Sequence, residues 1–195
     1  MANLAKNQVV TKRVRLSFVN LAEPKKIGDT DKEARYSVTC IIPKTLNGQE
    51  HPTITAIKNA IKAAAEAGAQ KHFGGRVPTN VKNTLKDGDT EVDDLGVLKN
   101  EKYPEYKGHY YIRVSTKFTP KVLDENGNQI LDSEKIREKI FSGCYGQVSM
   151  SFYAYHNEAN RGVSAALCNV KFLDGKEEDR LTSQLSGDEF NEFGE

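Results

Sequence analysis

The chain has 195 residues, of which 37% are hydrophobic and 28% are charged, and it contains no Trp. That length accommodates one medium-sized domain with a substantial core. No run approaches the roughly 18 apolar residues of a membrane span, and the N-terminus lacks the apolar block of a signal peptide, so we expect a cytoplasmic protein without a membrane partner. The three cysteines are widely spaced and form no CxxC pair, which indicates reduced thiols rather than disulfides.

The net charge of +1 conceals a difference between the body of the chain and its end. Residues 174–195 carry eight acidic and two basic side chains, a formal charge of −6, which leaves +7 on residues 1–173. A basic body joined to an acidic segment is typical of a polyanion-binding protein that carries its own electrostatic competitor. We therefore expect a folded domain over residues 1–173 and a flexible, disordered acidic tail over residues 174–195. A merely solvated charged terminus is the simpler alternative.

The first part of the chain predicts two strands and a helix. Residues 9–18 (VVTKRVRLSF) alternate between apolar and polar side chains, with Phe18 on the inward face, and residues 34–42 (ARYSVTCII) alternate in the same way. Apolar side chains then recur at helical spacing in ITAIKNAIKAAAEAG, with Thr53 as the predicted cap and Gly68 as the stop.

A polar, Gly-rich insertion without clear periodicity occupies about residues 69–107. The third strand is predicted at residues 109–118 (HYYIRVSTKF), with Phe118 facing inward. A shorter helix is predicted at residues 133–141 (SEKIREKIF), capped by Asp132 or the serine that follows it.

Two further strands are predicted at residues 146–155 (GQVSMSFYAY) and 162–172 (GVSAALCNVKF). Five strands with one or two helices, most strands having one buried and one solvent face, favour a mainly β protein. We predict a five-stranded OB-type barrel with a long insertion, and the main alternative is a β-sandwich.

The solvent faces of the four alternating strands combine cations with tyrosines and contain no acidic residue. The positions are Arg13, Arg15, Arg35, Tyr111, Arg113, Lys117, Tyr153 and Tyr155. Single-stranded bases stack on aromatic rings, at roughly 1–3 kcal/mol per base, while phosphates attract Arg and Lys independently of sequence. If these faces lie on one side of the barrel, they predict a nucleic-acid-binding surface. The alternative is that the rings only stabilise cross-strand pairs.

Signs of catalytic or metal chemistry in the sequence are weak. The loop KDGDTEVDD gathers Asp87, Asp89 and Asp94 but lacks the glycine of an EF-hand, so a metal-dependent nuclease is kept only as an alternative. The histidines show no ligand spacing, and FGGRVP lacks the Lys-Ser/Thr of a P-loop. Cys144 has no oriented base that would make it a nucleophile. We predict a binding protein without metal or cofactor, not an enzyme.

Several segments carry a resemblance to a known family. They are RVRLSFVNLAEPK, ARYSVTCIIPK, the Ile/Ala-rich helix, YKGHYYIRVSTKFTPKVLD and FSGCYGQVSMSFYAYHNEANRGVSAALCNV. The sequence resembles bacteriophage and prophage single-stranded-DNA-binding proteins, first catalogued as a domain of unknown function and similar to the OB-type protein of short-tailed coliphages. The most specific parts are GCYG at 143–146 and the aromatic strand after it, whereas the insertion at 86–102 departs from the family by its length.

The resemblance implies sequence-non-specific coating of single-stranded DNA during phage replication and recombination, in the cytoplasm of the host cell. Within this class a strand-annealing recombination protein is the alternative, and formation of a homo-oligomer is left open. A protein-interaction module without nucleic-acid affinity is an alternative from another class.

The chain ends in SGDEFNEFGE, where two aromatic rings lie among carboxylates. These predicted tail residues are Asp188, Glu189, Phe190, Glu192 and Phe193. Carboxylates can mimic phosphates in a basic groove, and rings can occupy base-stacking sites there. Apolar anchors in an acidic disordered segment also suit binding to phage or host replication proteins.

Overall fold

A computed structural model describes residues 4–26, 33–79, 81–157 and 160–181 of the chain. The predicted tail residues Asp188, Glu189, Phe190, Glu192 and Phe193 lie outside these ranges. None of the helices within the described ranges is long and apolar enough to cross a membrane.

The described chain is rich in strands. The strands are β1 (Gln8–Val10), β2 (Val14–Lys25), β3 (Arg35–Pro43), β4 (Thr45–Leu46), β5 (Gln49–Glu50), β6 (Leu85–Asp87), β7 (His109–Thr116), β8 (Lys121–Leu123), β9 (Tyr145–His156) and β10 (Arg161–Asp174). The helices are α1 (Pro52–Ala67), α2 (Ala69–His72), α3 (Lys99–Lys102) and α4 (Ser133–Lys139), with 3-10 turns η1 (Pro104–Tyr106) and η2 (Glu177–Asp179).

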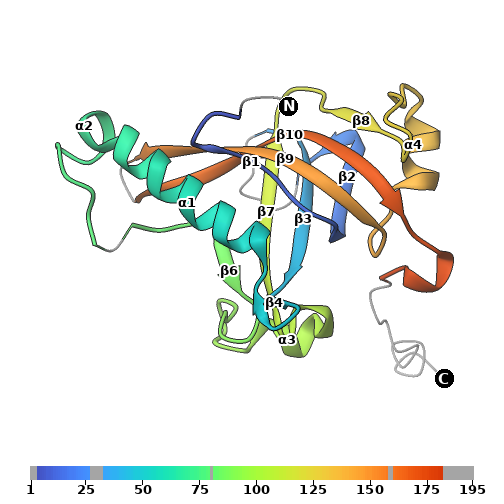
Figure 1. The fold of residues 1–195 in the computed structure, drawn as a ribbon, viewed down its shortest axis with the longest axis horizontal. Coiled ribbons are helices and arrows are strands. Elements are labelled where there is room, and N and C mark those ends of the chain that lie inside the picture. The colour runs from blue at the N-terminus through green and yellow to red at the C-terminus, as the bar shows by residue number, and fades with distance from the viewer. Residues whose placement is uncertain (1–3, 27–32, 80, 158–159, 182–195) are drawn as a thin grey trace, which may run out of the picture.

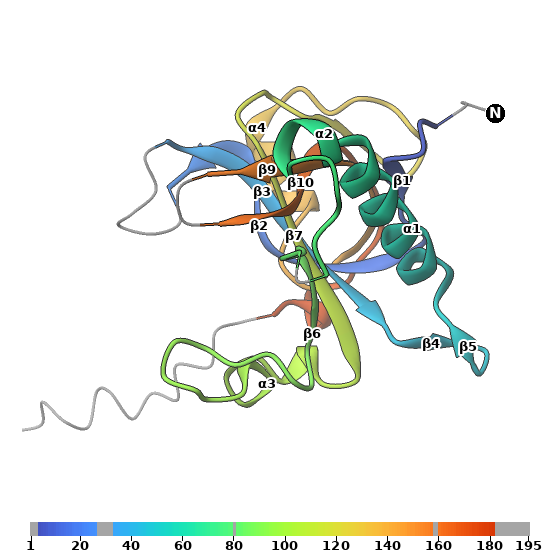
Figure 2. The same cartoon turned by 90° about the vertical axis from the view of Figure 1, so that its left-hand side faces the viewer.

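Strand pairing closes a barrel (Figures 1 and 2). Among the described residues the ring runs β9–β2–β3–β7–β10 and returns to β9, with β7 and β10 parallel and the other pairs antiparallel. These are the five strands that the alternating pattern predicts. The OB-type barrel is therefore confirmed, and the β-sandwich is wrong because its two sheets would not be joined into one ring.

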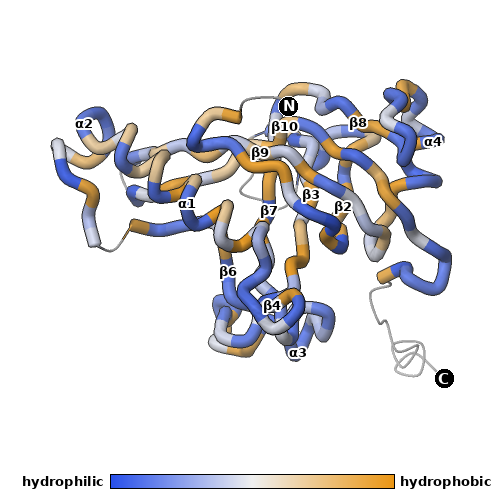
Figure 3. Tube along the Cα trace, viewed as in Figure 1, coloured by the Kyte–Doolittle hydropathy of each residue, from blue (hydrophilic) through white to orange (hydrophobic). Residues whose placement is uncertain are grey.

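The core fills the barrel and extends under α1. Leu16, Ile112 and Phe152 are fully buried inside, and Ile54 and Ile57 of α1 are equally buried. The helix packs against β1, β9 and β10 and lies along one side of the barrel (Figure 1). Figure 3 shows apolar and polar residues interspersed along the barrel strands, whereas the chain around α3 is mostly polar.

The helix caps differ in part from the prediction. His51 caps α1 by accepting from the Thr53 amide at 3.2 Å, whereas the Thr53 hydroxyl accepts from the Lys12 amide at 2.9 Å. The Thr53 cap is therefore wrong, because that hydroxyl joins the helix to the chain before β2. Asp132 caps α4 as predicted. Gly68 ends α1 as predicted, and the short helix α2 starts at the next residue.

Two phenylalanines predicted to face inward point outward instead. The register of β2 against β3 shifts between Ser17 and Asn20, and Phe18 within this bulge has φ 47° and is 45% exposed. An extra residue in one strand reverses the alternation, so the ring moves to the solvent face. Phe118 is 81% exposed because β7 ends before it, at Thr116.

The first residues of the acidic segment are folded. β10 continues through Asp174, η2 follows, and the Leu181 amide donates to the Ser142 carbonyl at 2.7 Å. The expectation of disorder from Asp174 onward is therefore wrong for residues 174–181. Strand pairing with β9 holds Asp174, and the contacts of Arg15 with Asp179 and of Leu181 with Ser142 hold the residues after it; a loss of hydrophobic content does not reveal these contacts.

Candidate nucleic-acid interface

Strand register shows which of the predicted residues share a face. Arg15 lies opposite Ile41, Ile41 opposite Tyr111, and Tyr111 opposite Lys86, which makes one row across β2, β3, β7 and β6. Directly opposed residues point to the same side of a sheet. These side chains therefore occupy the outer face of the barrel, while Leu16 and Ile112 point into the core.

The same face continues across the parallel pair to β9. Arg113 is two residues before Ser115, which lies opposite Ala166 of β10. Ser164, two residues before Ala166, lies opposite Tyr153 of β9. The alternation therefore places Arg113 and Tyr153 on one outer face, although 40 positions separate them in the chain.

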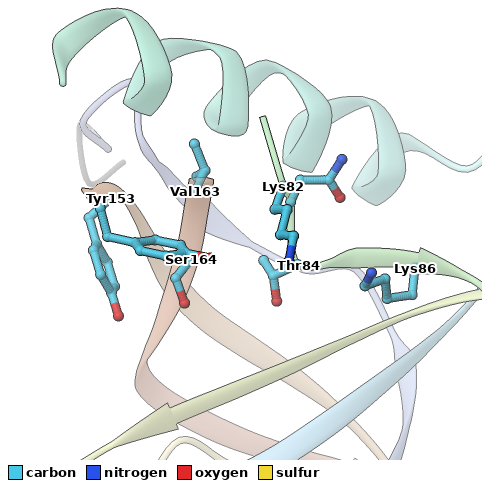
Figure 4. Close-up of a pocket in the computed structure, with 8 residues that line it drawn as sticks. Lys82, Thr84, Lys86, Tyr153, Val163 and Ser164 are labelled. Atoms are coloured by element: carbon cyan, nitrogen blue, oxygen red, sulfur yellow. The ribbon is translucent and has the colours of Figure 1, made fainter. Parts of the chain in front are cut away.

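A hollow at the β9 end of this face contains the two predicted tyrosines of that strand. Its lining residues are Lys82, Asn83, Thr84, Lys86, Tyr153, Tyr155, Val163 and Ser164, around about 520 Å³. Tyr153 is 47% exposed. In Figure 4, Tyr153 and Ser164 lie on one side of the hollow, and Lys82, Thr84 and Lys86 lie on the other. We call this the Tyr153 hollow. It combines one exposed ring and one partly buried ring with ammonium groups, the chemistry of a single-strand platform.

Lys82 is fixed beside this hollow by β10. The Val163 amide donates to the Lys82 carbonyl at 2.8 Å, and a Cβ on Gly162 would lie only 2.4 Å from that oxygen. The absence of a side chain at Gly162 therefore permits the two backbones to approach. The Lys82 ammonium donates to the Asn160 side chain.

A second hollow lies where the insertion crosses the outer face. It encloses about 460 Å³ and is lined by Phe18, Asn20, Thr39, Asp93, Lys99, Lys102, Tyr103, Tyr106, Tyr111 and Arg113. Phe18 meets Tyr103 edge-on at a centroid distance of 5.4 Å, and Tyr106 continues the cluster at 5.4 Å from Tyr103. We call this the Tyr103 hollow. It adjoins the Tyr153 hollow because Lys86 and Tyr111 are cross-strand partners.

Tyr111 is not the open platform that the alternating pattern predicts. Its ring is 7% exposed and stacks on Tyr106 at 4.2 Å with an interplanar angle of 9°. The insertion thus covers the face on which a base would stack, which corrects the prediction. Burial raises the pKa of Tyr111 to about 12. Among the described residues, its hydroxyl has no hydrogen-bond partner.

The insertion is held to the barrel by a cation and two carboxylates. The Lys44 ammonium lies 2.7 Å from Asp87 Oδ1 and 2.8 Å from Asp89 Oδ2, while Asp89 Oδ1 accepts from the Gly108 amide at 2.9 Å. The Lys44 hydrogen bonds lower the pKa of Asp89, and the two carboxylates raise that of Lys44. Asp87 and Asp89 therefore tie the insertion to Lys44, which follows β3, and Asp89 also ties it to Gly108, which precedes β7.

This arrangement does not fit the nuclease alternative. Two of its three proposed carboxylates, Asp87 and Asp89, already neutralise Lys44. Within the described ranges, no group of three or more His, Cys, Asp or Glu side chains is placed to hold a metal ion.

Arg13 and Arg15 hold the C-terminal segment rather than lining either hollow. Arg13 Nη2 lies 2.7 Å from Asp174 Oδ1, and its guanidinium is 3.5 Å from the Tyr145 ring centroid. This contact lowers the pKa of Asp174. Arg15 donates to the Gly143 carbonyl at 3.2 Å and to the Asp179 carbonyl at 2.8 Å. Sequence patterning does not reveal these partners, and the role of Arg13 and Arg15 as phosphate contacts stays a prediction.

The two remaining predicted cations lie toward another end of the face. Lys117, just beyond β7, pairs with Glu33, and both side chains are about half exposed. Arg35 begins β3 and is partly buried. Neither lines the two hollows.

The family model for the single-stranded-DNA-binding protein of Enterobacter phage Enc34 matches residues 7–194, nearly the whole chain. The chain belongs to this family. The curated protein p50 of Acyrthosiphon pisum secondary endosymbiont phage 1 is 27% identical over 161 residues, covering 82% of this chain and 79% of p50.

Solved structures support the same fold. The Enc34 protein in complex with single-stranded DNA gives a TM-score of 0.66 and 25% identity, covering 90% of this chain and 95% of that chain. Gp2.5 of bacteriophage T7, a single-stranded-DNA-binding protein, gives a TM-score of 0.56 at 16% identity, covering 90% and 93%. The named structural relatives are DNA-binding proteins rather than enzymes, and the resemblance seen in the sequence is confirmed.

For this member of the Enc34 family, the alternating pattern missed half of the candidate interface. The missed residues are Phe18, Lys82, Lys86, Lys99, Lys102, Tyr103 and Tyr106. A signal for four of them was present, since KNEKYPEYKG places two tyrosines among lysines inside an otherwise polar insertion. Tyrosine–lysine interleaving in a loop is the same chemistry that the strands display.

Proposed function

We propose that the protein binds single-stranded DNA without sequence specificity and coats and protects it during phage replication and recombination. Family membership and the likeness to a DNA-bound relative support this function. The observation that carries it for this chain is the Tyr153 hollow, where exposed Tyr153 and partly buried Tyr155 lie beside Lys82 and Lys86. Rings stack on bases while ammonium groups neutralise phosphates, and neither contact reads sequence.

The bound strand follows the outer face between the two hollows. Thr84 of the Tyr153 hollow contacts the Arg113 backbone, and Arg113 lines the Tyr103 hollow. Cations therefore lie at both ends of this path, while among the residues that the structure describes Asp93 is the one acidic side chain lining the two hollows. This distribution favours a polyanion.

The acidic tail regulates access to this face and recruits replication proteins. Leu181 packs against the cluster of Ile41, Tyr106 and Tyr111, so the chain leaves the barrel beside the Tyr103 hollow. Residues 182–195 carry four acidic side chains and no basic one. Electrostatic attraction to Lys99, Lys102 and Arg113 supports competition between the tail and DNA.

Fluorescence anisotropy of labelled oligo-dT and of a duplex, each at two salt concentrations, tests the main proposal. We expect strong preference for the single strand and a log–log salt slope of about −0.7 per phosphate neutralised. Equal affinity for duplex, or an affinity that salt does not change, would contradict it.

Deletion of residues 182–195 tests the regulatory role. The shortened protein should bind oligo-dT more tightly, most clearly at low salt, because a competing polyanion has been removed. Phe190→Ala with Phe193→Ala is the matched variant that keeps every charge; it should weaken capture of replication proteins while retaining DNA affinity. Unchanged DNA affinity after the deletion would remove the competitor role.

A further inference from the structure

The Tyr103 hollow is walled by rings from three separate parts of the chain. Phe18 comes from the bulge in β2, Tyr103 and Tyr106 from the insertion, and Tyr111 from β7. Phe18 and Tyr103 meet at 82°, so the two rings present surfaces at right angles. Such a corner can contact both the face and the edge of a flat aromatic ligand.

Phe18 is held in this corner by an unusual backbone. Its φ of 47° lies in the left-handed region, where a bulky side chain is a genuine outlier. The bulge takes a large apolar ring out of the core and leaves it 45% exposed. Backbone outliers of this kind cluster at ligand-binding sites, where the surrounding structure maintains them.

The other lining groups suit a nucleotide. Thr39 and Asn20 supply polar atoms beside the rings, and Asn20 is oriented by its amide, which donates to the Phe18 carbonyl at 3.2 Å and to Ser37 Oγ at 3.3 Å. Lys99, Lys102 and Arg113 also line the hollow. A volume of about 460 Å³ lies within the usual range of small-ligand sites, about 300–1,000 Å³.

We infer that the Tyr103 hollow is a pocket for one unstacked nucleobase of the bound strand, with its flanking phosphates on the lysines and Arg113. The inference rests on the proposed function and adds that one base of the bound strand occupies a defined place on the protein. The Tyr153 hollow offers rings on which any base can stack. The Tyr103 hollow encloses a single base, so the positions of a bound oligonucleotide are not equivalent.

Photocrosslinking to the full-length protein tests the pocket directly. A short oligo-dT carries one 5-iodouracil, moved through each position in turn, and adducts are located by mass spectrometry after binding is verified by anisotropy. We expect adducts on Phe18 or Tyr103 from a narrow range of positions. A bound oligonucleotide that yields adducts only on Tyr153 or Tyr155, or none on the pocket rings, would overturn the pocket. Failure of the oligonucleotide to bind at all would instead refute the proposed function.

Single abasic sites provide a second readout. Removal of one thymine should weaken binding by roughly 5- to 150-fold at the most sensitive position, the range expected for one stacked base, and less elsewhere. Tyr103→Ala should abolish this dependence on position. Tyr153→Ala, the matched control in the other hollow, should lower affinity while the dependence remains. Equal behaviour of the two variants would overturn the distinction between the hollows.

Discussion

Gly88 controls how closely the insertion packs on the barrel, and Gly88→Ala is the sharpest perturbation of that packing. An added Cβ would lie 2.1 Å from the Tyr106 carbonyl oxygen and 2.8 Å from that of His109. Ordinary contact begins at 3.4 Å, so the Tyr106 backbone must move by about 1.3 Å. This displacement separates Tyr106 from Tyr111, with which it now stacks at 4.2 Å.

The expected cost combines overpacking, about 1–3 kcal/mol, with loss of a ring contact of about 0.5–1.5 kcal/mol. Because the insertion can yield locally, we expect a net loss of about 1–3 kcal/mol in the free energy of unfolding. At about 2–4 °C per kcal/mol for a chain of this size, the melting temperature falls by several degrees. Affinity for oligo-dT also falls, since Tyr103 moves with Tyr106.

Urea unfolding and anisotropy measure the two effects. Gly96→Ala is the matched control in the same insertion, because its Cβ would meet nothing within 4 Å and its cost arises only from φ +80°. An unfolding midpoint for Gly88→Ala equal to that of the wild type would refute the packing argument. A lowered midpoint with unchanged DNA affinity would show that the insertion does not shape the interface.

Three further predictions concern groups away from the two hollows or buried beneath them. Arg15→Met should accelerate hydrogen exchange at the Leu181 amide by releasing η2; reduced DNA affinity with unchanged exchange would instead make Arg15 a phosphate contact. Burial raises the pKa of the two buried thiols to about 12 and about 11, so a thiol reagent at pH 8 should label Cys168 alone until urea is added; a second rapidly labelled thiol would contradict this. Folding favours the neutral form of Tyr111, because burial raises its pKa to about 12. The stabilising contribution of this side chain should therefore be complete below pH 10 and fall as the pH rises from 10 toward 12. Urea midpoints at pH 9 and 11 that do not differ between wild type and Tyr111→Phe would contradict this prediction.

The sequence predicts the barrel well because its alternation is a direct consequence of burial. Val148, Met150 and Phe152 of β9 are buried while the residues between them are partly exposed, so the period-two pattern survives along that strand. The same rule fails at Phe18, since one extra residue in β2 reverses the alternation without any marker in composition.

The interface is predicted only in part because its other half depends on tertiary contacts. Tyr153 and Arg113 follow from strand alternation, whereas Tyr103 is placed by an insertion without periodicity. Its position depends on the Lys44 ion pairs, and Lys44 is far from the insertion in sequence. Alternation places Arg15 on the solvent face but cannot reveal its acceptor, the Asp179 carbonyl, which lies 164 residues away in the chain.

The pairing of β10 has a consequence for synthesis of the protein. Among the described strands, β10 is the last to be made, and it contacts β7, β8 and β9. The ring stays open until β10 has been made, because β10 supplies both the β7 and the β9 pairings that close it. Val163 and Ser164 of β10 also line the Tyr153 hollow, so the hollow is completed only when the barrel closes.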